Sequence, residues 1–139
     1  MIELIMALVV MGILLGMLGP RLGSIRDRGA VRSGKQQVSA YLATARAAAI
    51  RRGRPATFHA ASNSIWVTVG ADTVGSRIAL GDEYSITLSS ASAIDSVRFD
   101  ARGFATNLPG TQIFRVTRGV YRDSVCVSRA GMIARRCGF

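Results

Sequence analysis

The stretch that decides the fold is MIELIMALVVMGILLGMLGP, the first twenty residues of the chain (Met1–Pro20). From Leu4 to Gly19 it carries no charged or strongly polar side chain. As an α-helix, the 19 residues before Pro20 would be about 28 Å long, close to the hydrocarbon thickness of a bilayer. A secretory signal peptide usually has a basic start and a cleavage site of small residues, and this segment has neither. We therefore expect a membrane-spanning helix or the core helix of a bundle.

Composition divides the rest of the 139 residues by charge. The chain is 49% hydrophobic yet has 18 Lys and Arg against 8 Asp and Glu, a net charge of +10. Residues 1–20 carry a net −1, residues 21–54 +8, residues 55–97 −3 and residues 98–139 +6. This length fits one domain with an appendage, and the hydrophobic content excludes a wholly disordered basic tail.

Glu3 is the only ionisable side chain in residues 1–20. A carboxylate near the end of an apolar helix costs a few kcal/mol in lipid unless it is paired. Two interpretations stay open at this point. Glu3 lies close enough to the terminus to reach the lipid headgroups, or it is held for a cation on a partner subunit.

A second helical pattern follows the apolar segment. Several glycines and Pro20 make residues 19–34 a poor helix in isolation. From Val31 onward, apolar residues recur at spacings of three, four and seven, which is typical of a helix that packs on a sheet. The run Arg52-Gly53-Arg54-Pro55 is a stop signal for this helix. The members of the apolar stripe are Val31, Val38, Tyr41, Leu42, Ala45, Ala48 and Ala49.

After Pro55 the pattern changes to short β-rich runs separated by turn-rich segments such as Ala71–Ser76 and Leu108–Gly110. The predicted fold is α+β, with an antiparallel sheet packed on the C-terminal half of one long helix. Three parts are expected: residues 1–20 as the apolar helix, 21–55 as the basic neck and amphipathic half-helix, and 56–139 as the sheet domain. The predicted strands are Ala56–Ala60, Ser64–Val69, Tyr84–Leu88, Ser96–Phe99, Gln112–Thr117, Val120–Ser128 and Met132–Arg136.

The two cysteines, Cys126 and Cys137, fall in the last predicted hairpin. A two-residue turn there would place Cys126 opposite Arg135, whereas a four-residue loop, Ala130–Ile133, would place the cysteines directly opposite each other. Both registers bring the sulfur atoms near bonding range. A disulfide implies an oxidising compartment, and two free buried thiols are the alternative. The positive-inside rule instead places the Arg-rich neck in the cytoplasm, a conflict that a basic leader before Met1 would resolve.

The residues offer little support for catalysis. His59 is the only histidine, and no His/Cys cluster has metal-ligand spacing. No nucleophile elbow or phosphate-binding loop is present. Asp82 and Glu83 are adjacent and are expected in a solvated turn. We predict a protein that is not an enzyme and that has no metal site and no cofactor.

Arginines gather in the C-terminal region, and 17 of the 18 cations of the chain are Arg. Arginine suits bidentate contacts to phosphate. Two readings stay open: a solvated edge that discourages strand pairing, or a DNA-binding patch. The residues concerned are Arg129, Arg135 and Arg136, with Arg118 and Arg122 nearby.

Three stretches resemble the type IV pilin-like proteins, specifically the GspH/FimT group of pseudopilins and minor pilins. Met1-Ile2-Glu3-Leu4 and the apolar run up to Pro20 look like the prepilin N-terminal segment. YLATARAAAIRRGRPATF (Tyr41–Phe58) is similar to the group's helix end before its first strand, and VRFDARGFAT (Val97–Thr106) resembles its F-D-x-R-G strand and turn. Together these stretches come from both ends of the chain.

The resemblance implies a type IV pilin-like fold and a structural subunit of a type IV pilus or a type II secretion pseudopilus. It implies that Glu3 pairs with the N-terminal amine of a neighbouring subunit, that Pro20 bends the helix, and that a membrane peptidase removes a leader. Methylation is a further implied feature. The implied partners are other pilin subunits and the inner membrane, with a periplasmic C-terminal domain that enters the filament. The alternative is a minor pilin that captures DNA for uptake through its Arg-rich hairpin.

Overall fold

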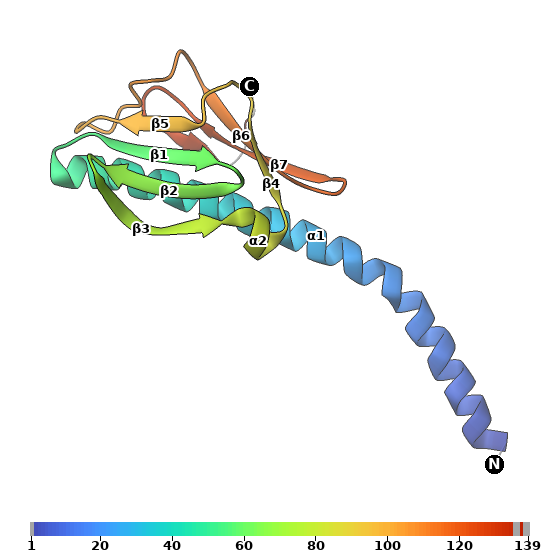
Figure 1. Cartoon of the computed structure of the whole chain (residues 1–139). Helices are drawn as coiled ribbons and strands as arrows, with labels where there is room; N and C mark the ends of the chain where they lie inside the picture. Colours follow the sequence, from blue (N-terminus) through green and yellow to red (C-terminus); the bar gives the residue numbers. More distant parts are fainter. Residues whose placement is uncertain (1, 135–136, 138–139) are drawn as a thin grey trace.

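A single long helix, α1 (Ile2–Arg52), runs through the first third of the chain in this computed structural model. The structure describes residues 2–134 and 137, with the side chains of residues 15–22 excepted. Figure 1 shows the N-terminal half of α1 projecting away from the sheets as a curved rod, while its C-terminal half lies against them. Among the residues whose side chains are described, no helix is both long and apolar enough to cross a membrane.

The helix continues through residues 19–34, where the sequence predicts poor helical propensity. An interior glycine costs about 1 kcal/mol relative to alanine, which weakens a helix without ending it. Contacts with the sheets support only the last part of this segment, because the buried stripe of α1 begins at Val31. Pro20 lies within the helix, but its side chain is outside the described part, so its role as a bend stays a prediction.

The described strands form two four-stranded antiparallel sheets. The first has the order β3-β2-β1-β5, and the second has the order β4-β6-β7-β8. The strands of the first are β1 (Ala56–Ala61), β2 (Ser64–Val69), β3 (Asp72–Ala79) and β5 (Ser96–Phe99). The strands of the second are β4 (Thr87–Ser90), β6 (Gln112–Arg118), β7 (Tyr121–Val127) and β8 (Ile133–Ala134).

Two sequence predictions are wrong between residues 71 and 88. The segment Ala71–Ser76, predicted as a turn, forms most of β3, an edge strand whose side chains are largely exposed and therefore show no apolar alternation. The predicted strand Tyr84–Leu88 spans the end of a short helix, α2 (Leu80–Tyr84), and the start of β4. Ser85 separates them with a left-handed backbone (φ 51°), a conformation that a continuous strand cannot contain.

One hydrophobic core lies between α1 and the two sheets. The predicted stripe supplies its helical side: Val38, Leu42, Ala45 and Ala49 have no exposed surface. The two sheets meet where the Phe58 ring on β1 packs edge-on against the Phe114 ring on β6, with centroids 5.4 Å apart. Helix α1 is therefore held by the sheets only from about residue 27 onward, and its first half is left without a packing partner within the described chain.

Candidate functional site

The projecting half of α1 is the most unusual surface of the molecule. Between residues 2 and 14, ten large apolar side chains are at least half exposed, from 55% for Val9 to 76% for Ile2. They occupy ten of the thirteen positions in this range, so they cover the helix on all sides rather than along one stripe. A helix that is apolar all round is normally buried in a large core or in lipid. Glu3 lies at its first turn, and among the described residues no cation lies within ion-pair distance of its carboxylate.

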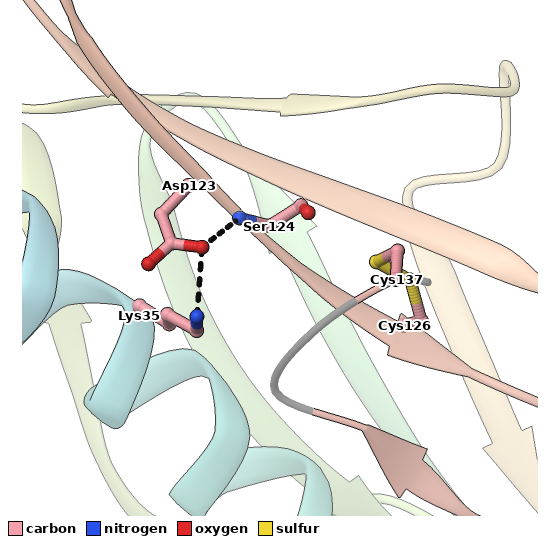
Figure 2. Close-up of a disulfide and its surroundings, with 5 residues drawn as sticks. All are labelled: Lys35, Asp123, Ser124, Cys126 and Cys137. Atoms are coloured by element: carbon pink, nitrogen blue, oxygen red, sulfur yellow. Dashed lines mark hydrogen bonds and ion pairs between the residues drawn. A yellow bond between two sulfur atoms is a disulfide. The ribbon is translucent and has the colours of Figure 1, made fainter. Parts of the chain in front are cut away.

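Two ion pairs fasten the middle of α1 to the second sheet. The Asp27 carboxylate pairs with the Arg118 guanidinium at the end of β6, with Oδ1 and Nε 2.7 Å apart. The same guanidinium also donates a hydrogen bond to the Tyr84 carbonyl. Eight residues on, the Lys35 ammonium lies 2.7 Å from the Asp123 carboxylate of β7, as Figure 2 shows. The Lys35 side chain is only 13% exposed, so this pair is largely removed from water. These contacts fix the direction in which the free half of the helix leaves the sheets.

A groove of about 590 Å³ lies beside these ion pairs, between α1 and the start of β7. Four of its lining side chains are cationic and one is anionic, so its net charge is +3. The Arg28 guanidinium lies 5.2 Å from the centroid of the Tyr121 ring in the same groove. The lining residues are Arg28, Val31, Arg32, Lys35, Gln36, Tyr121, Arg122 and Asp123.

The C-terminal hairpin has a register that differs from both predictions. Cys126 pairs with Ala134, and Val127 pairs with Ile133. The Ser128 N–H donates to the Met132 carbonyl at 3.0 Å, which leaves a three-residue loop, residues 129–131. Gly131 adopts a left-handed φ of 73° at the last loop position, as a three-residue hairpin loop requires.

The disulfide expected from the sequence is present. Cys126 and Cys137 are bonded, with their Cα atoms 5.7 Å apart, a usual separation for such a bridge (Figure 2). The bond ties the chain beyond β8 back to β7, which is part of the core. The prediction that these two cysteines form a bridge is therefore confirmed, although the register that brings them together is a different one.

The predicted arginine patch does not come together as one surface among the described residues. Arg118 and Arg122 flank the β6–β7 turn near α1, whereas Arg129 follows the opposite end of β7. Arg122 and Arg129 are seven positions apart, mostly along β7, which corresponds to about 20 Å. Arg135 and Arg136 lie outside the described residues. Arg129 instead lines a shallow hollow that also includes Arg102 and Phe104.

The turn that contains Arg102 is organised by Asp100. The Asp100 carboxylate accepts the N–H groups of Phe104 and Arg102, both at 2.9 Å. These contacts, led by the hydrogen bond from Phe104, lower the pKa of the Asp100 carboxyl. The F-D-x-R-G motif noted in the sequence is thus a structural turn in this chain.

His59 belongs to a stacked row on the outer face of the first sheet. Its ring stacks on the Trp66 indole with centroids 5.0 Å apart, and the Arg77 guanidinium lies 4.5 Å from the indole centroid. His59 Nε2 is 3.0 Å from the Thr68 hydroxyl, and partial burial lowers the pKa of the imidazole. The row is explained by sheet packing and requires no chemical role.

Among the described residues, no group of three or more His, Cys, Asp or Glu side chains comes close enough to hold a metal ion. Asp82 and Glu83 are both exposed to solvent, but the prediction of a turn is wrong, because they lie in helix α2. Three surface features stand out among the described residues: the apolar half-helix, the cationic groove and the hollow at the C-terminal hairpin.

A long helix whose first half stands free and whose second half packs on antiparallel sheets defines the class of type IV pilin-like proteins. The family model described as type II transport protein GspH matches residues 36–131, and the chain belongs to this family. The family match and the fold together confirm the GspH/FimT-like resemblance noted in the sequence.

The fold is also similar to that of the type IV minor pilin FimU of Pseudomonas aeruginosa, in two crystal forms. The first aligns with a TM-score of 0.69 at 18% identity and covers 81% of this chain and 92% of that one. The second aligns with a TM-score of 0.59 at 18% identity and covers 74% and 90%. No curated protein sequence matches the chain.

The cationic groove was not predicted as a site from the sequence, which assigned its helical residues only to a basic neck. A signal was present, because Arg28, Arg32 and Lys35 follow the spacing i, i+4, i+7 and therefore share one face of the helix. The contribution of Arg122 could not be anticipated in the same way. It depends on where the start of β7 meets α1, which is a tertiary contact.

Proposed function

We propose that this protein is a minor pilin or pseudopilin, a non-catalytic structural subunit of a type IV pilus or a type II secretion pseudopilus. It is anchored in the inner membrane by its N-terminal segment, with the sheet domain in the periplasm, and it enters the filament through the same segment. One observation carries the proposal: the ten exposed apolar side chains between residues 2 and 14.

Covering these side chains with apolar surroundings is energetically favourable. A fully buried large aliphatic side chain contributes about 1.5–3 kcal/mol relative to an exposed one. Covering ten that are already partly shielded by their own helix would contribute on the order of 10 kcal/mol. Neither sheet of the described chain lies against them (Figure 1). Lipid before assembly and the helices of neighbouring subunits after it are surroundings that supply such cover.

Glu3 has a defined role in this proposal. Inside a helical bundle, a lone carboxylate or a lone ammonium is costly, whereas the two together neutralise each other. Glu3 would pair with the N-terminal amine of an adjacent subunit and so set the axial register of the incoming helix. The sheet domain takes no part in this contact, because its core begins almost thirty residues later, at Val31.

The test compares Glu3→Ala with Glu83→Ala in a strain that assembles the filament. Glu83 is an exposed carboxylate on α2, so its removal matches the chemistry of the first change without touching the projecting helix. We expect the Glu3 variant to be at least tenfold depleted from sheared, purified filaments, while the Glu83 variant is retained. Normal incorporation of Glu3→Ala would refute the proposal, provided that near-UV circular dichroism shows a folded sheet domain for both.

A second candidate function, DNA capture, is favoured by the hollow at the C-terminal hairpin. Arg102, Phe104 and Arg129 line it, and Phe104 is 47% exposed. Cations beside an exposed aromatic ring are typical of single-strand binding surfaces. The full-length chain in neutral detergent can be titrated with single-stranded and duplex DNA at several salt concentrations. Affinity that is absent at low salt, or unchanged by Arg102→Gln with Arg129→Gln, would reject this function.

A further inference from the structure

The cationic groove between α1 and β7 is built from two separate elements. Arg28, Arg32 and Lys35 lie on one face of α1, and Tyr121 and Arg122 approach from the start of β7. The volume of about 590 Å³ lies within the range of about 300–1,000 Å³ that is typical of ligand pockets. The groove is therefore large enough to receive a small group rather than a single ion.

The charges in the groove are only partly compensated. Lys35 is paired with Asp123 at 2.7 Å, and Arg28 lies over the Tyr121 ring. Within the part of the chain that the structure describes, no carboxylate lies within ion-pair distance of Arg32 or Arg122. Arg28 and Arg32 are four residues apart on the same helix face, a spacing at which like charges repel. A bound anion would relieve this repulsion.

The position of the groove indicates the source of that anion. The Cα atom of Arg28 lies about 14 Å along the helix axis from Gly19, where the apolar segment ends. Helical side chains lean back toward the N-terminus, so the guanidinium lies closer to the apolar segment than its Cα does. The headgroup layer extends roughly 5–8 Å beyond the hydrocarbon, which leaves a distance that a long Arg side chain can span.

Exposed apolar side chains flank the same cations. Ile25 is 67% exposed and lines a hollow that adjoins the groove and shares Arg28 and Arg32 with it. Val120, at the tip of the β6–β7 hairpin, is 86% exposed and precedes Tyr121 and Arg122. In Figure 1 this hairpin projects from the sheets on the side where α1 leaves them. Apolar side chains next to cations are characteristic of surfaces that rest on a membrane interface.

We propose that this groove binds the phosphate of an anionic phospholipid headgroup, with Arg28, Arg32 and Arg122 as its ligands. Arginine forks match phosphate oxygens bidentately, and three of them converge on one volume. The bound headgroup would hold the sheet domain against the membrane while the subunit waits for assembly. The inference rests on the proposed membrane-anchored function, and it adds a specific lipid site outside the apolar helix.

The test counts bound lipids on the full-length chain. The chain is purified in a neutral maltoside detergent, equilibrated with equimolar phosphatidylglycerol and phosphatidylcholine, and examined by native mass spectrometry. Phosphatidylcholine reports non-specific association with the apolar helix, so the ratio of the two lipids isolates the headgroup contribution. The groove variant is Arg32→Gln with Arg122→Gln. The matched control is Arg51→Gln with Arg98→Gln, two exposed arginines that lie on the last turn of α1 and on β5 of the first sheet, outside the groove.

We expect a clear preference for phosphatidylglycerol in the wild-type chain and in the control. In the groove variant the preference should fall about 25-fold, at roughly fivefold for each cation removed near a lipid surface. Equal binding of both lipids by the wild type, or an unchanged preference in the groove variant, would overturn the proposal. Displacement of the lipid by 10 mM inorganic phosphate would assign the groove to a free anion instead.

A third outcome combines two results: duplex DNA binds the wild type more tightly than the groove variant, and neither chain prefers one lipid. This outcome would assign the groove to nucleic acid and would likewise overturn the proposal. These failures can be told apart from failure of the filament function. That function is tested with Glu3→Ala in assembled filaments, where Arg32 and Arg122 are unchanged.

Discussion

Gly34 marks a close approach between α1 and the sheets, and its replacement by alanine gives a sharp test of the packing. A Cβ atom at this position would overlap Ile86 Cδ1 and would lie 3.3 Å from Val116 Cγ1. Ile86 is only 2% exposed and Val116 is fully buried. The methyl end of Ile86 therefore has no solvent to move into, and the new atom must displace packed neighbours.

Two opposing terms set the magnitude of the Gly34→Ala effect. Alanine is favoured over glycine in a helix interior by about 1 kcal/mol. Overpacking a well-filled core costs about 1–3 kcal/mol. The packing term is the larger, so we expect a net loss of about 1 kcal/mol in the free energy of unfolding. For a domain of this size the melting temperature should fall by about 4 °C.

Gly29→Ala is the matched control, because a Cβ atom at Gly29 meets nothing within 4 Å. It should leave stability unchanged or raise it by up to about 1 kcal/mol. Ile86→Val removes the Cδ1 methyl group and should cost about 1 kcal/mol alone. Combined with Gly34→Ala, it should cost less than the sum of the two single changes.

The assay is thermal unfolding of the full-length chain in neutral detergent, followed by near-UV circular dichroism of the sheet domain. A Gly34→Ala chain that is as stable as Gly29→Ala would refute the packing between α1 and the second sheet. A double variant of Gly34→Ala and Ile86→Val whose loss in the free energy of unfolding equals the sum of the two single losses would also refute this packing.

Three further predictions concern the sheet domain. Replacing Cys126 and Cys137 by serine should lower the free energy of unfolding by about 3 kcal/mol, because the bridge closes a loop in the unfolded chain. Adding a reductant to the wild-type chain should lower its free energy of unfolding by the same amount. Burial lowers the pKa of His59, so its ¹³Cε1 resonance should titrate with a midpoint below 6.5. The contribution of the neutral imidazole to the free energy of unfolding should be complete above pH 6.5 and should be lost as the pH falls through the pKa of the folded state. The lowered pKa of Asp100 likewise predicts stability that is complete above pH 3.8 and lost on further acidification, and Asp100→Asn should remove this acid dependence.

The sequence predicted the elements that bury regular apolar patterns. The stripe from Val31 to Ala49 and strands such as Ser64–Val69 are found where apolar periodicity places them. The edge strand β3 was missed because its side chains are largely exposed on both faces of the strand, so apolar and polar residues do not alternate along it. The division into two sheets also escaped prediction, since it depends on pairings such as β1 with β5 across almost forty residues.

The features of the candidate site likewise fall into those that local sequence predicts and those that depend on tertiary contacts. Glu3 and the apolar segment could be identified from sequence, because their significance depends on local composition. The groove could not, because Arg122 reaches Arg28 and Arg32 only through the docking of β7 on α1. The three-residue loop that sets the cysteine register is decided by Gly131, whose left-handed backbone favours this loop over both lengths that the sequence predicts.

The central claim is that the exposed half of α1 is covered by other pilin subunits in an assembled filament. The most direct measurement places a photo-crosslinking amino acid at Leu8, which is 62% exposed in the isolated chain, with Arg115 on the second sheet as the control position. After irradiation of intact filaments, we expect a covalent product between the Leu8 probe and another pilin-type subunit, and a much lower yield from the control. Filaments that contain the protein but give only uncrosslinked chain or lipid adducts at Leu8 would contradict it.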